Sequence, residues 1–178
     1  MSYSFSGIFT NTNNSVVIEA AKQRWPFCTI YRFQTPFEGI AVYREPEMIS
    51  GTYIQSYTEK DKIENELIEF SSQFSNITFI HLRTDCHGGD CTYDGFACRH
   101  GKILIDNRGI GPDQIKRHIE IKKLREIVET LDVYIGGAGN FEPFERGFFD
   151  NEENIIYPIK KTVEPFLIKK KKPWWKSW

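Results

Sequence analysis

The chain has 178 residues, of which 40% are hydrophobic and 15% aromatic, and its formal net charge is −1. This charge argues against a general nucleic-acid binder, which would carry a basic surface, and no apolar run approaches the ~20 residues that span a bilayer. We therefore expect a single soluble domain over residues 1–165, large enough to bury a core, followed by a basic, Trp-rich tail over residues 166–178.

The N-terminal part of the chain predicts three strands and one short helix. Apolar and polar residues alternate over 3–10, and further β-like runs follow over 29–33 and 39–43. Between the first two runs, residues 15–24 predict a helix, with Ser15 as its N-cap.

Two long helices are predicted where apolar residues recur every three or four positions. The first spans residues 58–74 and has an acidic polar face, and the second spans residues 112–131 and is basic in its middle. Both apolar stripes are wide, so we expect the helices to pack on a sheet. Their opposite charges allow two arrangements: they pair electrostatically on one face of the sheet, or each presents its charge to a partner.

Residues 77–106 alternate with period two and contain two Gly-bearing turns, which predicts a three-stranded antiparallel meander. If the first turn joins Cys86 to Cys91, the facing pairs are Thr84–Tyr93, Arg83–Asp94, Leu82–Gly95 and Ile80–Ala97. The second turn then gives the pairs Phe96–Ile105, Ala97–Leu104 and Cys98–Ile103. The predicted fold class is therefore α+β, with a mainly antiparallel sheet centred on this meander.

The cysteines invite a zinc site, because Cys86, Cys91, Cys98 and His100 offer three thiolates and an imidazole. However, the seven residue steps from Cys91 to Cys98 span roughly 23 Å of strand, and the two side chains point to opposite faces. We therefore expect neither a metal nor another cofactor. Cys86 and Cys91 are placed so that a disulfide is geometrically allowed. Because the N-terminal residues do not resemble a secretory signal, we expect a cytoplasmic protein with reduced thiols.

The C-terminal third contains short elements and two ambiguous segments. Residues 133–135 and 155–159 predict strands. The segment 141–150 is dense in phenylalanine and carboxylates, which favours either a loop whose rings fill the core or an exposed recognition loop. The tail joins lysines to three tryptophans, and it is either a disordered terminus or a segment that binds an anionic membrane or nucleic acid.

The turn end of the meander gathers polar residues on one face, the face that would also bear Phe79, Phe96 and Ile105. These residues are His81, Arg83, Asp85 and Asp94, with His87 and Asp90 in the adjoining loop. They suit acid–base catalysis, a hydrogen-bonded network or an acidic recognition edge. The sequence has no nucleophile elbow, no P-loop and no helical histidine pair, so we favour a binding protein over an enzyme. The expected partner-binding residues are Asp85, His87, Asp90, Asp94, Phe141, Glu142 and Glu145.

In overall character the chain resembles the immunity proteins that bacteria carry against polymorphic or contact-dependent toxins. The segments that carry this resemblance are YSFSGIF, DCHGGDC and FEPFERGFF, within a small aromatic-rich α+β protein. The resemblance implies a non-enzymatic protein that binds and blocks one toxin domain, often through charge complementarity. A strongly acidic chain would point to a nuclease toxin, and the near-neutral charge departs from that pattern. The alternative is a small hydrolase or other enzyme that uses the polar residues of the 81–94 hairpin.

Overall fold

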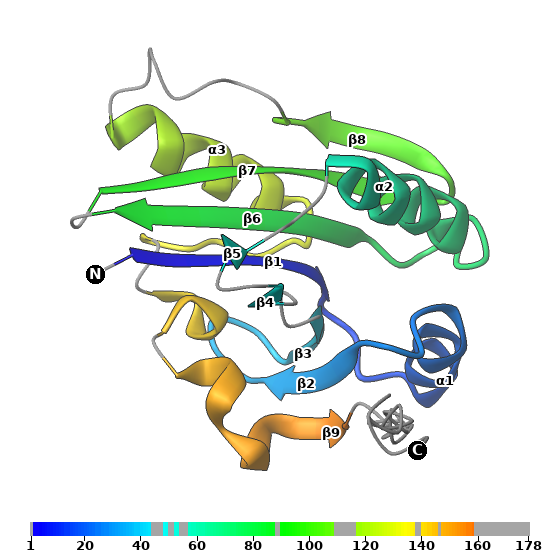
Figure 1. Cartoon of the computed structure of the whole chain (residues 1–178). Coiled ribbons are helices and arrows are strands. Elements are labelled where there is room, and N and C mark those ends of the chain that lie inside the picture. Colours follow the sequence, from blue (N-terminus) through cyan, green and yellow to red (C-terminus); the bar gives the residue numbers. More distant parts are fainter. Residues whose placement is uncertain are drawn as a thin grey trace, which may run out of the picture.

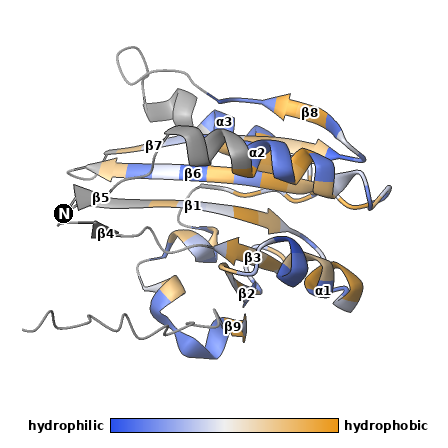
Figure 2. Ribbon diagram, turned by 45° about the vertical axis from the view of Figure 1, so that its right-hand side comes forward, coloured by the Kyte–Doolittle hydropathy of each residue, from blue (hydrophilic) through white to orange (hydrophobic). Residues whose placement is uncertain are grey.

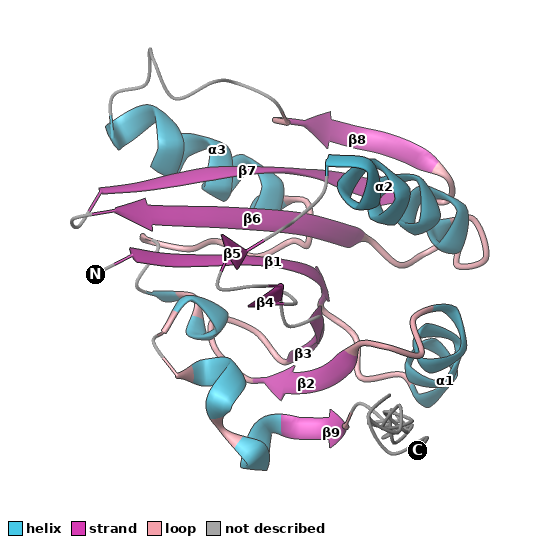
Figure 3. Ribbon diagram, viewed as in Figure 1, coloured by secondary structure: helices cyan, strands magenta, loops and turns pink. Residues whose placement is uncertain are grey.

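The computed structural model describes residues 2–43, 48–49, 52–53, 57–87, 90–108, 117–137, 140–145 and 147–158. Seven strands form one antiparallel sheet in the order β8-β7-β6-β1-β3-β2-β9 (Figure 1, Figure 3). The strands are β1 (Ser2–Thr10), β2 (Thr29–Phe33), β3 (Gly39–Tyr43), β6 (Phe79–His87), β7 (Asp90–Arg99), β8 (Lys102–Asp106) and β9 (Ile155–Tyr157). A separate two-stranded sheet consists of β4 (Met48–Ile49) and β5 (Thr52–Tyr53). The predicted fold class is confirmed.

Helices cover both faces of the large sheet. α1 (Ser15–Arg24) and α2 (Tyr57–Ser71) pack on one face, and α3 (Arg117–Glu129) packs on the other (Figure 1). The face of α3 also receives the short 3-10 helices η3 (Glu142–Phe144) and η4 (Phe148–Asp150), and η5 (Glu152–Asn154) follows them. Both predicted long helices are present. They lie on opposite faces of the sheet, so the alternative in which they pair on one face is wrong. Residues 112–116 of the second helix lie outside the described residues.

Two smaller predictions in this part of the fold are wrong. Helix α1 is capped by Asn14 and not by Ser15, because Asn14 Oδ1 accepts a hydrogen bond from the backbone N–H of Val16 at 2.8 Å. Residues 133–135 do not form a strand, although Ile135 is buried in the core. The last predicted strand is β9, which ends at Tyr157, and residues 159–178 lie outside the described part of the chain.

Alternating side chains along the strands build two hydrophobic cores, one on each face of the sheet. Phe9 and Leu82 point toward α3, whereas Phe79 and Phe96 point toward α1 and α2. All four side chains are almost fully buried. At the edge of the sheet, β8 is coloured as hydrophobic over much of its length in Figure 2. The sheet is therefore a central layer between two layers of helix.

The predicted register of the β6–β7 hairpin is confirmed in full. The facing pairs are Cys86–Cys91, Thr84–Tyr93, Arg83–Asp94, Leu82–Gly95 and Ile80–Ala97. Gly95 has a φ of 156°, and a Cβ at this position would lie 2.0 Å from the carbonyl oxygen of His81. Glycine is therefore required where β7 approaches β6.

The predicted register of the β7–β8 hairpin is only partly correct. Cys98 pairs with Ile103 as predicted, but a β-bulge follows, so that Ala97 pairs with Ile105 and Phe96 with Asp106. Ile105 consequently packs against the core on the α3 side, not on the face of Phe96. The bulge shifts the end of β8 by one residue, which carries Asp106 onto the face that α2 covers.

The cysteines differ in state from the prediction. Cys86 and Cys91 form a disulfide with their Cα atoms 4.0 Å apart, so the expectation of reduced thiols is wrong for this pair. Cys28 and Cys98 are not part of this disulfide. Burial raises the pKa of the Cys98 thiol to about 11, and its side chain lies on the opposite face of the sheet from Cys91. In the described residues, no helix is long and apolar enough to cross a membrane.

Candidate functional site

A polar cluster lies within the α2-facing core, and we call it the His81 network. It consists of Ser6, Glu64, His81, Asp106 and Arg108. His81 is 2% exposed, and its Nε2 atom lies 2.9 Å from the hydroxyl of Ser6 on the neighbouring strand β1. Its Nδ1 atom faces Oε1 of Glu64, a residue of α2, at 3.8 Å. Two strands and one helix thus bring these three side chains together.

Arg108, which follows β8, joins the other end of this network. Its Nη1 lies 2.8 Å from Glu64 Oε2, and its Nε lies 2.7 Å from Asp106 Oδ1. The guanidinium also sits over the ring of Phe96, 4.7 Å from the ring centre. The hydrogen bond from Arg108 holds the pKa of Asp106 below its usual value. The two carboxylates in turn raise the pKa of Arg108, so the network contains a permanently charged centre.

The environment of His81 keeps its imidazole neutral. Burial, and then the nearby charge of Arg108, lower the pKa of His81 to about 4. A neutral imidazole can accept a hydrogen bond from the Ser6 hydroxyl through Nε2 when its ring proton is on Nδ1. Among the other members of the cluster, Glu64 is buried and Ser6 is half-buried.

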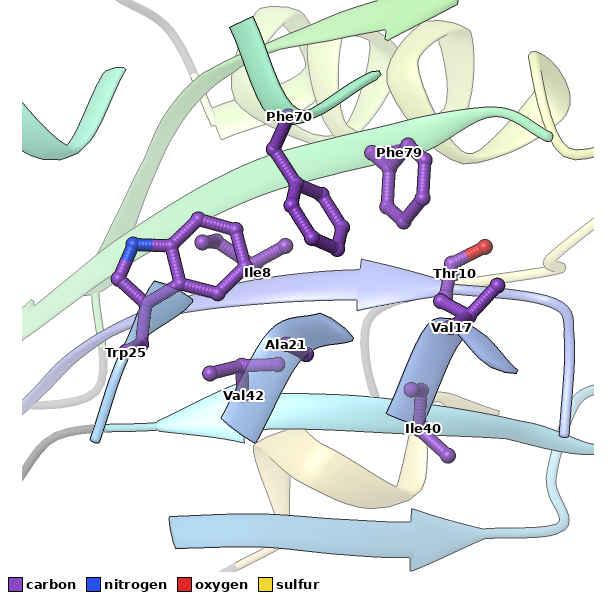
Figure 4. Close-up of a pocket in the computed structure, with 9 residues that line it drawn as sticks. All are labelled: Ile8, Thr10, Val17, Ala21, Trp25, Ile40, Val42, Phe70 and Phe79. Atoms are coloured by element: carbon purple, nitrogen blue, oxygen red, sulfur yellow. The ribbon is translucent and has the colours of Figure 1, made fainter. Parts of the chain in front are cut away.

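A small cavity of about 10 Å³ lies elsewhere, between α1, α2 and the sheet (Figure 4). Trp25 and Phe70 face each other across it with ring centres 4.8 Å apart, and Thr10 supplies its one hydroxyl. That hydroxyl already donates to the carbonyl oxygen of Thr78 at 2.8 Å. With a volume near that of one water molecule and an apolar lining, the cavity is a packing defect and not a ligand site.

At the turn end of the β6–β7 hairpin, the predicted site residues have different surroundings. Asp94 forms a two-pronged ion pair with Arg83, which compensates its charge. Asp85 is exposed on the same face of the sheet. Strand β1 reinforces this end, since Ser2 pairs with His87. The side chains of His87 and Asp90 lie outside the described residues.

The predicted site residues of the segment 141–145 also differ in their surroundings. Phe141 is 0% exposed and packs edge-on against Phe9 and Phe33, so it is a core residue. For Glu142, partial burial acts to raise the pKa, but hydrogen bonds from the backbone of Gln34 and Thr35 outweigh it and leave the pKa lowered. Its Oε2 accepts from Gln34 N at 2.8 Å, and Glu142 thus ties η3 to the end of β2.

Glu145 is exposed, and its neighbour in the chain places it near the hairpin. The ring of Phe144 stacks on Tyr93 of β7 at 5.5 Å and contacts Phe5 of β1 at 5.0 Å, on the α3 side of the sheet. Asp85 and Glu145 therefore flank one end of the sheet from opposite faces. Of the predicted residues, the structure leaves Asp85 and Glu145 exposed near the same end of the sheet, holds Asp94 and Glu142 in internal contacts, and buries Phe141.

Comparisons with known proteins leave the chain without an assigned family. No family model, curated protein or solved structure matches it. Among the described residues, no group of three or more His, Cys, Asp or Glu side chains is arranged to hold a metal ion. The fold therefore defines an α+β protein with a seven-stranded antiparallel sheet, and function has to be inferred from its side chains.

Proposed function

We propose that the chain is a binding protein that neutralises a cognate toxin domain, in the manner of a bacterial immunity protein. The observation that carries the proposal is the placement of Asp85 and Glu145, which are 60 residues apart in sequence and exposed at the same end of the sheet. Both have rigid supports. The Cys86–Cys91 disulfide closes the hairpin beside Asp85, and the stacked ring of Phe144 holds the backbone next to Glu145.

The distribution of charge along the chain supports a basic partner. Residues 159–178 contain seven lysines and one glutamate, a net charge of +6, so that the formal −1 of the whole chain leaves −7 on residues 1–158. The near-neutral total thus combines an acidic body with a basic segment. An acidic body favours association with a positively charged surface and speeds the encounter.

Co-expression with the protein encoded by the adjacent reading frame tests this function. We expect the two proteins to co-purify and the chain to relieve the growth arrest that the partner causes when it is expressed alone. The double charge reversal Asp85→Lys/Glu145→Lys is expected to weaken both effects. Asp94 is unsuitable for this test, because its reversal would place a lysine against Arg83 and disturb the hairpin itself. Unchanged growth arrest together with no complex contradicts the proposal.

A further inference from the structure

The arrangement of Ser6, His81 and Glu64 goes beyond the proposed binding function, because these three side chains meet in the order of a hydrolytic triad. The hydroxyl of Ser6 lies 2.9 Å from His81 Nε2, within hydrogen-bond distance. The opposite ring nitrogen, Nδ1, faces a carboxylate oxygen of Glu64 at 3.8 Å. In a hydrolytic triad the same ring nitrogens face the nucleophile and the acid respectively.

Ser6 is the least buried of these three side chains. The side chains of Glu64 and His81 are 7% and 2% exposed, whereas Ser6 is half-buried and is the member nearest to solvent. Ser6 and His81 lie on adjacent antiparallel strands, where Ser6 pairs with Arg83 and His81 with Ile8, and their side chains share the α2-facing side. A substrate that reaches Ser6 would therefore meet the hydroxyl first, with the base and the acid behind it.

Arg108 fixes the acid. Its guanidinium binds Oε2 of Glu64 at 2.8 Å, and Oε1 of the same carboxylate faces His81 Nδ1 at 3.8 Å. For His81 Nε2 to accept the Ser6 proton, the ring proton must be on Nδ1, the side that faces Glu64. The 3.8 Å separation is longer than a hydrogen bond, and catalytic contacts of this kind commonly shorten only when substrate binds. Because the pKa of His81 is about 4, its imidazole is unprotonated at neutral pH.

We propose that Ser6 is a nucleophile for acyl transfer, with His81 as general base and Glu64 as the group that orients it. The substrate class is a small carboxylic ester. As Ser6 Oγ bonds to the acyl carbon, its proton passes to His81 Nε2, and the departing alcohol then takes that proton as the ester bond breaks. Water, deprotonated by His81, subsequently cleaves the acyl–Ser6 bond and releases the carboxylic acid, so that one ester and one water yield one acid and one alcohol.

A fluorophosphonate probe tests the proposal on the full-length protein. We expect covalent labelling at neutral pH, located at Ser6 by peptide mass spectrometry and lost in Ser6→Ala. His81→Gln, which places a polar amide beside Ser6, is expected to slow labelling about 10²–10⁴-fold, the usual contribution of a general base. Ser4→Ala is the matched control, because Ser4 is a serine two residues away on the same strand. Labelling in this control should equal that of the parent protein.

A second variant replaces the nucleophile and tests the role of His81 without the fluorophosphonate probe. In Ser6→Cys, transfer of the thiol proton to His81 during attack should make alkylation by iodoacetamide faster at neutral pH than that of a free cysteine. Adding His81→Gln should return the alkylation profile to that of a free thiol. Absence of labelling at Ser6, or equal rates with and without His81 in both assays, overturns the assignment.

Discussion

Arg108 donates to the buried carboxylate of Glu64 at 2.8 Å, and this contact ties the segment after β8 to helix α2. The Glu64 side chain is 7% exposed and that of Arg108 is 26% exposed. A carboxylate at such a position is stable only with a partner, because its own desolvation is costly. The ion pair therefore holds together two elements that are 44 residues apart in sequence.

Removing the guanidinium should leave this carboxylate buried without its cation. We expect Arg108→Ala to lower the free energy of unfolding by about 2 kcal/mol, less than for a fully buried pair because Arg108 is partly exposed. Urea denaturation measures the change. In the background of Glu64→Gln, which has no charge to compensate, the same Arg108→Ala substitution should cost clearly less. Equal costs in the two backgrounds contradict the coupling.

His81 makes stability dependent on pH. Its pKa is about 4 in the folded protein and near 6.5 in the unfolded chain, so between these values the unfolded state binds the proton and the folded state does not. Stability should therefore fall as the pH is lowered from 6.5 toward 4, by roughly 3 kcal/mol over that window. Urea denaturation at several pH values should show a flatter profile for His81→Gln. Identical slopes in the two proteins exclude His81 as the cause.

The Cys86–Cys91 disulfide closes a short loop and should contribute about 2 kcal/mol to stability by restricting the unfolded chain. Thermal unfolding with and without a thiol reductant measures this contribution. The double variant Cys86→Ser/Cys91→Ser should match the reduced parent protein and no longer respond to reductant. A response that persists in the double variant would have to come from another cysteine.

Variants at Phe141 and Glu145 should separate an effect on stability from an effect on recognition, although only three residues lie between them in the chain. Phe141→Ala removes a fully buried ring from an aromatic cluster and is expected to lower the free energy of unfolding by roughly 3–5 kcal/mol. Glu145→Lys changes an exposed side chain and should stay within about 0.5 kcal/mol of the parent protein. Thermal or urea unfolding of both variants checks the contrast, and a neutral Phe141→Ala would contradict the core assignment.

Local patterns were sufficient to predict most elements and one hairpin. The β6–β7 register follows from a single turn and from alternation that continues on both strands, with Leu82 facing Gly95 and Arg83 facing Asp94. The register of the β7–β8 hairpin could not be predicted in the same way. Ile103, Leu104 and Ile105 are all apolar, so the binary pattern does not distinguish the regular register from the bulged one.

The His81 network was largely beyond prediction, because it depends on contacts between distant segments. His81 was among the candidate residues, but Ser6 reaches it only through the β1–β6 pairing, across 75 residues of sequence. Asp106 reaches the network only through the bulge. Glu64 did carry a local signal, since it lies three residues before the buried Leu67 and hence on the apolar side of α2.

The most direct test of the binding account is the dissociation constant for the toxin domain encoded in the adjacent reading frame, measured by isothermal titration calorimetry. We expect Asp85→Lys/Glu145→Lys to raise this constant at least about tenfold, with the loss growing as salt is lowered. The control is Glu129→Lys, an exposed change at the end of α3 near Asn11, at the opposite end of the sheet from the hairpin. The control should bind as tightly as the parent protein. Equal affinities for all three proteins would contradict a recognition surface built on Asp85 and Glu145.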